Sequence, residues 1–303
     1  MSQRYAYARY ITNLNYINSN DHWDDLIRQL DANGLRDKLQ CPFLISLYRS
    51  EQEKEEREKA QEANDNWYAK KTDAEHEEWY TKADLKIMFF GREPNWWVRY
   101  DEEGDDPADV GSVMAAYEDY LDDNYNAVNA HFYKERIDHR NRFLLFGVNG
   151  IMSGIREILK DFPDKRVSLI WNEISKLSKR KGEGGEAVNA FEHNIEKRCF
   201  HVIPKEIEIL KPDIVVFFTG PKETKYCDYI RENFNIIGEP IELPGLPIDD
   251  VSKLQLEGVK LAYLTHHPGY MPEGKKANDF HWTLYNAILA DIKENIDKLL
   301  KKE

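Results

Sequence analysis

Four short apolar runs recur along the chain from residue 85 onward, and each is followed by a glycine or a polar side chain. They predict strands at 85–91, 167–170, 213–218 and 261–265. Helical patterns separate the runs, and this alternation is typical of a mostly parallel sheet with α/β architecture. In such a sheet, ligands bind in the crevice beyond the carboxyl ends of the strands, so we expect an active site there.

The segments between and after these strands have the spacing of helices. Apolar residues at intervals of three and four predict helices at 113–133, 142–160, 190–210 and 279–300, and another that begins near residue 223. The glycines at 182, 184 and 185 predict a loop after the second strand. The segment 238–260 contains three prolines and reads as a hairpin-like connection.

The first 84 residues read as a helical extension of an α/β domain that spans 85–303. Asp21 and the polar residues before it are a plausible helix start, and Gly34 ends that helix. A second helix is expected within 43–71, where the side chains after Ser50 are mostly charged. That helix is either simply solvated or a surface for a protein partner, and a lid or a dimer contact also stays open.

The charge of the chain is concentrated in two acidic blocks. Its net charge is −13, which taken alone argues against a nucleic-acid partner. Residues 51–84 carry twelve acidic and six basic side chains, and residues 101–125 carry ten acidic and none basic. The remainder is therefore net +3, and a ligand site outside the blocks can still have a positive field.

Composition excludes several classes of protein. No apolar stretch approaches the ~20 residues that a membrane span requires, and the first residues lack the apolar segment of a signal peptide. We expect a cytoplasmic protein. Its three cysteines are scattered and odd in number, which argues against a disulfide framework. They are also too few for a four-cysteine iron–sulfur cluster, and we expect no cofactor.

Three residues at predicted strand ends can carry chemistry. Glu93 follows a buried strand and a glycine, where a carboxylate can position water or stabilise a cation, although it could equally be a turn residue. Asn172 offers one acceptor and two donors to a base edge, or it forms an Asx-turn or caps a helix. His267 can donate to an oxyanion on a leaving group. Joint metal ligation with its neighbour His266 is awkward, because adjacent residues on an extended chain point to opposite faces.

The order and context of these residues resemble the uracil-DNA glycosylase superfamily. Gly91-Arg-Glu-Pro-Asn95 is similar to its first motif, Gly-Gln-Asp-Pro-Tyr, with Glu93 at the aspartate position. Trp171-Asn172-Glu-Ile-Ser-Lys176 is similar to an Asn-containing middle motif. The segment 210–220 resembles the helix and strand before the last motif, and His267-Pro268-Gly269 resembles His-Pro-Ser. The resemblance covers residues 85–303 and leaves the first 84 unexplained.

The resemblance implies a three-layer α/β/α fold with a four-stranded sheet and cleavage of the N-glycosidic bond of a flipped base. Glu93 would position water or stabilise the sugar cation, Asn172 would read the base edge, and His267 would stabilise negative charge on the departing base. The residues expected around the base are Gly91, Trp96 and Trp97, with Tyr100 and Phe143 as further candidates for an aromatic platform.

The sequence departs from the family at three of these motif positions. Glutamate replaces aspartate at Glu93, Asn95 replaces a tyrosine that helps to exclude thymine, and Gly269 replaces a serine. These departures leave three expectations open: excision of uracil, excision of a modified base, or loss of the activity.

Basic residues near two motifs are expected to contact the phosphates of DNA, whether single- or double-stranded. They are Lys176, Lys179, Arg180, Lys181, Lys275 and Lys276. Tyr270, with Met271, is the candidate wedge that opens a duplex. Two other interpretations stay open: a protein of this fold that binds nucleic acid, a nucleotide or a protein partner without turnover, and a different hydrolase or transferase acting on a small molecule.

Overall fold

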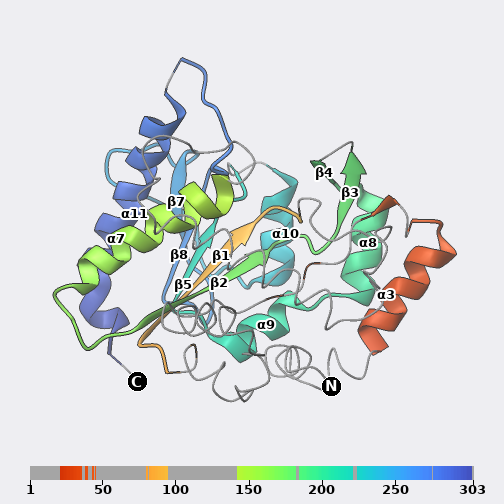
Figure 1. Ribbon diagram of the computed structural model, residues 1–303, viewed down its shortest axis with the longest axis horizontal. Coiled ribbons are helices and arrows are strands. Elements are labelled where there is room, and N and C mark those ends of the chain that lie inside the picture. The colour runs from red at the N-terminus through yellow and green to blue at the C-terminus, as the bar shows by residue number, and fades with distance from the viewer. Residues whose placement is uncertain are drawn as a thin grey trace, which may run out of the picture. The chain divides into compact units, whose positions relative to one another are not determined.

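The computed structural model describes residues 21–35, 38–39, 43, 45, 80, 82–94, 142–181, 184–220, 224–274 and 276–301 (Figure 1). These residues belong to two compact units, between which the chain crosses several times. The first unit holds the described residues up to Ala83, Glu93 and Pro94, and Ser175–Leu210. The second holds Asp84–Arg92, the described residues from 142 to Ile174, and the chain from Lys211 onward. The predicted boundary near residue 84 coincides with one crossing, but 175–210 groups with the N-terminal residues.

The second unit is built on a mixed, mostly parallel sheet of six strands. Their order is β2-β1-β5-β8-β7-β6. The first four are parallel, β7 is antiparallel to β8, and β6 is antiparallel to β7. The bounds are β1 Leu85–Gly91, β2 Val167–Glu173, β5 Ile214–Phe217, β6 Ile241–Glu242, β7 Val251–Leu254 and β8 Leu261–Thr265. The four predicted strands are confirmed. The expected total of four is wrong, because the hairpin-like segment 238–260 pairs with the edge of β8 and adds two strands.

Side chains of these strands alternate between the two faces of the sheet, because successive residues of a strand point in opposite directions. The rings of Phe89 and Phe218 stack on one face, with centroids 6.0 Å apart. The rings of Phe90 and Phe217 stack on the other, at 5.1 Å. In the β1–β2 register Phe89 lies beside Trp171, so Trp171 shares the Phe89 face.

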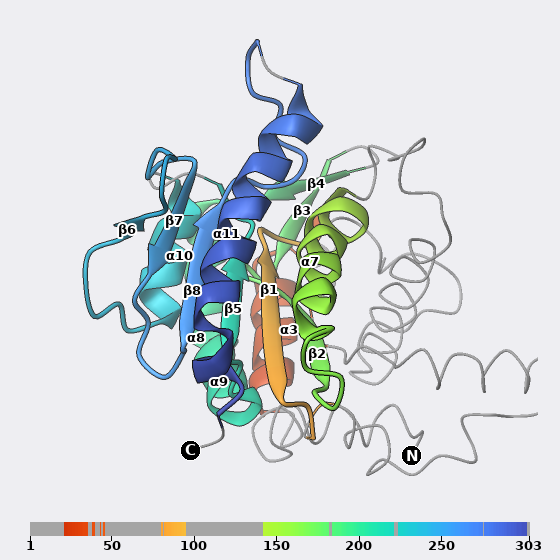
Figure 2. The ribbon, with the colours of Figure 1, turned by 90° about the vertical axis from the view of Figure 1, so that its left-hand side faces the viewer.

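Helices cover both faces of the sheet in the second unit. A π-helical turn, η5 (Phe143–Val148), leads into α7 (Asn149–Leu159), and α11 (Ala277–Leu299) packs beside it on the Phe89 face (Figure 2). Gly154 lies at this contact, where a Cβ atom would meet the side chain of Leu289. On the other face, Phe234 at the end of α10 (Lys225–Asn233) packs edge-on against Phe90 and Phe217.

The first unit contains the described elements α3 (Asp21–Ala32), β3 (Ser178–Lys181), β4 (Gly184–Ala187), α8 (Ala190–Cys199) and α9 (Ile203–Leu210). The helix predicted to end at Gly34 is confirmed, and Gly34 has the positive φ of 60° that a helix-ending glycine adopts. Gly184 and Gly185, which were predicted to lie in a loop, lie instead in β4, which pairs with β3. The single helix predicted at 190–210 is broken, since Pro204 cannot donate to the carbonyl of Phe200.

The remaining predicted helices fall partly inside and partly outside the described residues. The predicted helices at 142–160, near 223 and at 279–300 are confirmed as η5 with α7, α10 and α11. Those at 43–71 and 113–133 lie outside the described residues, apart from two positions near the start of the first. Within the part of the chain that the structure describes, no helix combines the length and hydropathy that a membrane crossing needs.

Candidate functional site

His267 lies in a tight turn directly after β8, at the carboxyl end of the parallel strands. The Tyr270 amide donates to the His267 carbonyl at 2.8 Å and closes the turn. The Gly269 amide donates to Nδ1 of the His267 ring at 3.1 Å. A Cβ atom at residue 269 would itself lie 3.1 Å from Nδ1, so glycine lets the amide approach without crowding the ring. Glycine at position 269 therefore has a local structural reason.

The hydrogen bond from Gly269 fixes the tautomer of His267. Because Nδ1 accepts, the proton of the neutral imidazole is on Nε2, which is then a donor. Burial, followed by the charges of Arg92, His281 and Arg142, lowers the pKa of His267 to about 3. The ring is therefore neutral near pH 7. Its Nε2–H can donate a hydrogen bond to an anion, and the positive charges of Arg92 and Arg142 favour an anion there.

Three side chains hold the His267 turn from outside. Arg142, at the start of η5, donates from Nε to the Pro268 carbonyl at 2.6 Å. His281 of α11 lies with Nε2 2.9 Å from the Tyr270 carbonyl and donates to it, and burial lowers the pKa of His281 to about 4. The ring of His266 stacks on Tyr270 with centroids 4.2 Å apart. These contacts fix the turn that carries His267.

Phe143 is the aromatic ring that the structure places beside His267. The two rings are stacked, with centroids 6.1 Å apart and an interplanar angle of 15°. Phe143 also contacts Trp171 at 6.1 Å and Phe218 at 5.7 Å, so it belongs to the Phe89 face of the sheet. Of the four aromatic residues considered for a base platform, Phe143 is the one described; Trp96, Trp97 and Tyr100 lie outside the described residues.

Glu173 is a buried carboxylate on the same face, and the sequence interpretation missed it. It ends β2, is 3% exposed, and its Oε1 accepts a hydrogen bond from Nε1 of Trp171 at 2.9 Å. Gly91 is its partner across the β1–β2 pair, and the Glu173 carboxylate occupies the space that a side chain at 91 would take. The strand pairing gives Gly91 a steric role: it makes room for Glu173.

Asn172 points away from His267. Its side chain is fully buried, with Nδ2 3.6 Å from the sulfur of Met88 and Oδ1 accepting from the Glu173 amide at 2.8 Å. In the register Asn172 lies beside Phe90, whose ring packs against Phe217 on the α10 face. The structure therefore does not bring Asn172 and His267 together, because the strand runs on to Glu173 and alternation turns Asn172 to the other face.

Arg92 and Glu93 follow β1. The Arg92 Nε donates to the Thr219 carbonyl at 3.0 Å, and the guanidinium lies 5.4 Å from the ring centroid of Tyr226. Gly220, at φ 109°, leaves the space into which Arg92 extends. Glu93 is part-buried and belongs to the first unit, so its role beside His267 stays a prediction.

The residues predicted to contact DNA fall into different settings. Lys176 is fully buried, and its ammonium group pairs with both carboxylate oxygens of Glu206 at 2.9 and 3.1 Å. It cannot be a phosphate contact at a rim, and that prediction is wrong. Lys179 is mostly buried and pairs with Glu192 at 3.0 Å, while the backbone of Arg180 and Lys181 forms β3.

The other predicted DNA contacts flank the His267 turn. Tyr270 is 40% exposed, and Met271, beside it, is 52% exposed. Lys276 is exposed at the start of α11, and Lys275 lies outside the described residues. Tyr270, Met271 and Lys276, which are expected at the duplex, are thus accessible next to the turn.

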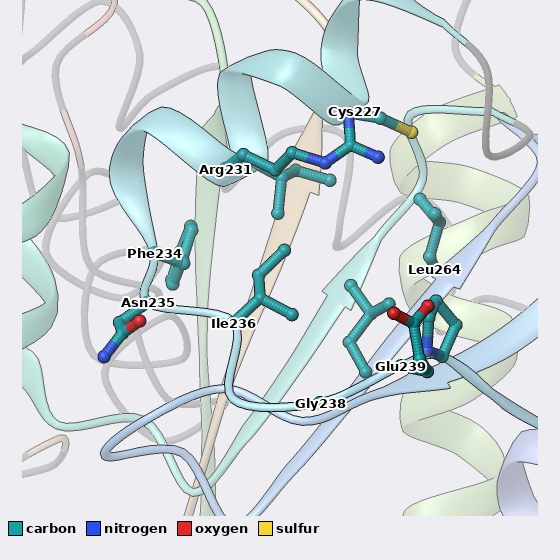
Figure 3. A pocket seen from close by; sticks show the side chains of 11 residues that line it. Cys227, Arg231, Phe234, Asn235, Ile236, Gly238, Glu239 and Leu264 are labelled. Atoms are coloured by element: carbon teal, nitrogen blue, oxygen red, sulfur yellow. The ribbon is translucent and has the colours of Figure 1, made fainter.

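A separate pocket of about 680 Å³ lies on the α10 face of the sheet. Figure 3 shows α10 side chains on one side and residues of the following loop on the other. Its lining is chiefly apolar, and two of its polar groups are bonded to neighbours: Arg231 to Asp228, and Asn235 to Glu257. Leu264, which lines the pocket, lies beside Phe217 in the register and so shares its face. The pocket is thus on the opposite face from Phe143.

No protein-family model and no curated protein matches this chain. Its function must therefore be argued from the site itself.

Proposed function

We propose that the chain is a base-excision glycosylase, a three-layer α/β/α protein of the uracil-DNA glycosylase type that hydrolyses the N-glycosidic bond of a flipped uracil or modified base. The observation that carries the proposal is His267: a neutral imidazole, held in its Nε2–H tautomer by the Gly269 amide and stacked beside Phe143. This arrangement suits an anionic, aromatic leaving group, and a departing nucleobase is both.

In the proposed reaction, the bond between C1′ of the sugar and the base nitrogen breaks, and its electron pair leaves with the base. The oxygen of a water molecule forms the new bond to C1′. Glu93 would hold that water, take its proton and stabilise the cationic sugar. His267 Nε2–H would donate to the base as negative charge develops on it, assisted by the fields of Arg92 and Arg142. The base nitrogen finally takes up the proton.

DNA would reach the site with its target base extruded from the stack. Extrusion costs a few kcal/mol, least for a damaged or unpaired base. Tyr270 and Met271 are exposed beside the His267 turn and would fill the gap in the duplex, and Lys276 would contact the backbone. Because the chain is acidic overall, cations near the site, such as Lys276, would provide most of the attraction to phosphate.

The test is base release from single- and double-stranded oligonucleotides that carry uracil, hypoxanthine or modified cytosines. We expect release by the wild-type protein and a fall of about 10²–10³-fold in rate for His267→Ala, the loss typical of removing one oxyanion donor. Glu93→Gln is expected to suppress release as well, while binding survives. His201→Ala, in the first unit, is the control histidine. A folded wild-type protein that releases no base would refute the proposal.

A second candidate is a protein of this fold that binds nucleic acid without turnover. One observation favours it: Asn172, the residue expected to read the base, is turned away from His267. It predicts binding to DNA that weakens steeply as salt rises, with no base released from any oligonucleotide. A hydrolase or transferase acting on a small molecule predicts no salt-sensitive DNA binding at all.

A further inference from the structure

Two guanidinium groups near His267 have only uncharged partners. Arg92 donates from Nε to a backbone carbonyl at 3.0 Å, and its guanidinium lies 5.4 Å from the ring centroid of Tyr226. Arg142 donates to a backbone carbonyl at 2.6 Å and to Oδ1 of Asn278 at 2.8 Å. Among the residues that the structure describes, neither arginine forms an ion pair with a carboxylate. Two positive charges therefore lie close to one histidine without a counter-charge.

Both guanidinium groups are anchored to the backbone that holds His267. Arg142 bonds to Pro268, the next residue of the turn. Arg92 bonds to Thr219 in the loop after β5, and the following amide of that loop donates to the last residue of β8 at 3.1 Å. The charges of both arginines lower the pKa of His267, which places them within electrostatic reach of its ring. The three side chains therefore meet where β1, β5 and β8 end.

A buried cation in this position needs a counter-charge. Arg142 is 6% exposed, and burial lowers its pKa because its charged form has lost hydration. Buried charges in proteins are generally paired. The exposed side chains of Arg28 and Arg231, which need a partner less, do pair with Asp25 and Asp228. No described carboxylate pairs with Arg142 in a chain of net charge −13, which indicates an anion that comes from outside the chain.

We infer that Arg92 binds a phosphate group beside His267, and that the buried Arg142 supplies further positive charge. For the source of that group the inference rests on the proposed function: the phosphate is a diester of the strand that carries the target base. A free nucleotide offers the same chemistry as a monoester, and the experiment separates the two sources.

The chemistry of Arg92 suits a phosphate that arrives from solvent. Arg92 and His267 are both partly exposed, so a ligand can reach them. A guanidinium has five N–H donors, and the bond to Thr219 uses one of the five in Arg92. The remaining donors form a planar fork, which can donate in parallel to two phosphate oxygens. The Nε2–H of His267 would stay available to the base while Arg92 holds the phosphate.

Titration of the full chain with inorganic phosphate tests the site without any nucleic acid. The nitrogen-15 signal of His267 Nε2 reports binding next to the ring, at an ionic strength held constant with sodium chloride. We expect a saturable shift in the wild type, an affinity weaker by about tenfold or more in Arg92→Gln, and a smaller loss in Arg142→Gln, because charge-assisted hydrogen bonds are the strong ones. Arg92→Lys keeps the charge but loses the fork, so its affinity should lie between those of the wild type and Arg92→Gln.

Arg231→Gln is the matched control, because it removes the same charge from an exposed arginine of α10, on the opposite face of the sheet from Phe143. Its affinity for phosphate should equal that of the wild type. Circular dichroism checks that each variant is folded, and Arg92→Lys supplies the comparison if Arg92→Gln does not fold. A wild type without a saturable shift overturns the site. Equal weakening in Arg231→Gln and Arg92→Gln also overturns it, because it would mean an adventitious ion only.

Dimethyl phosphate, a diester, and methyl phosphate, a monoester, identify the source of the group. Displacement of inorganic phosphate by the diester supports a nucleic-acid strand. Displacement by the monoester alone overturns the strand as the source and assigns the site to a free nucleotide.

The inference and the proposed function fail separately. Phosphate binding that depends on Arg92, without release of any base, overturns the glycosylase and leaves the phosphate site standing. Base release by a wild type that does not bind phosphate overturns the site and leaves the glycosylase standing.

Discussion

A single backbone amide decides which nitrogen of His267 can donate. Because the Gly269 N–H points at Nδ1, the neutral ring must carry its proton on Nε2. The ring stays neutral because burial and the nearby charges of Arg92, His281 and Arg142 make a second proton unfavourable. A histidine in this state would keep its charge during the proposed reaction, and this distinguishes it from a general acid.

The protonation of His267 can be measured directly. Nitrogen-15 NMR of the imidazole should show the Nε2–H tautomer and no titration between pH 8 and pH 5, since its pKa lies near 3. In Gly269→Pro the residue at 269 has no N–H, so the tautomer preference should weaken. A midpoint near 6.5 in the wild type would contradict the neutral ring, and with it the donor role.

Buried histidines also make stability depend on pH. The pKa of His281 falls from its ordinary value of 6.5 to about 4 in the folded state, chiefly through burial. Below pH 6.5 the unfolded chain therefore binds more protons than the folded one, and stability falls as pH falls. From pH 7 to pH 5 we expect His281 to contribute a loss of about 2 kcal/mol in the free energy of unfolding. Urea unfolding at both pH values measures it, and His281→Gln should lose less on acidification.

At the scale of elements, η5 and α7 each contain a glycine at a close contact, Gly147 and Gly154. A Cβ atom at Gly147 would collide with the ring of Pro268, next to His267, and would lie 3.3 Å from the ring of Phe218. A Cβ atom at Gly154, on the following helix, would meet only the flexible end of Leu289. The same substitution at these two glycines should therefore have different consequences.

We expect Gly147→Ala to reduce base release by tenfold or more, because it displaces the turn that holds His267, and small displacements of a catalytic group are costly. Overpacking should also cost about 1–3 kcal/mol of stability. Gly154→Ala is the matched control: Leu289 can move, and alanine favours the helix, so release should stay within about twofold. Equal losses in both variants would contradict a specific role for Gly147.

The elements also show how far the sequence could be interpreted. The strand at 261–265 was predicted with its observed bounds, because its apolar run stops at Thr265 and a histidine pair follows. The second strand was predicted to stop at residue 170, but pairing with β1 extends it to Glu173. That extension determines which residue lies on the His267 face of the sheet: because side chains alternate, it is Glu173 and not Asn172. Pairing between strands is a tertiary effect that no local pattern contains.

At the scale of the whole molecule, the chain passes between two units, and each has its own interior. The first unit encloses an ion pair between Lys176 and Glu206, which are 0% and 1% exposed. The Phe43 amide donates to the Lys176 carbonyl, and its ring lies 5.2 Å from the ammonium nitrogen. A basic residue in a basic stretch looked like a phosphate contact in the sequence, because its buried partner is 30 residues away.

This ion pair should control the stability of the first unit. Glu206→Ala leaves the Lys176 ammonium buried without its counter-charge, and such a loss costs about 3–5 kcal/mol. Replacing both partners, as in Lys176→Met with Glu206→Leu, removes the charge together with its need for a partner and should recover most of the loss. Hydrogen exchange should show lost protection in β3 and α9 of Glu206→Ala, while β1, β5 and β8 keep theirs. Equal deprotection of both sets would mean that the units unfold as one, and a double variant no more stable than Glu206→Ala would mean that the pair holds the fold by more than charge.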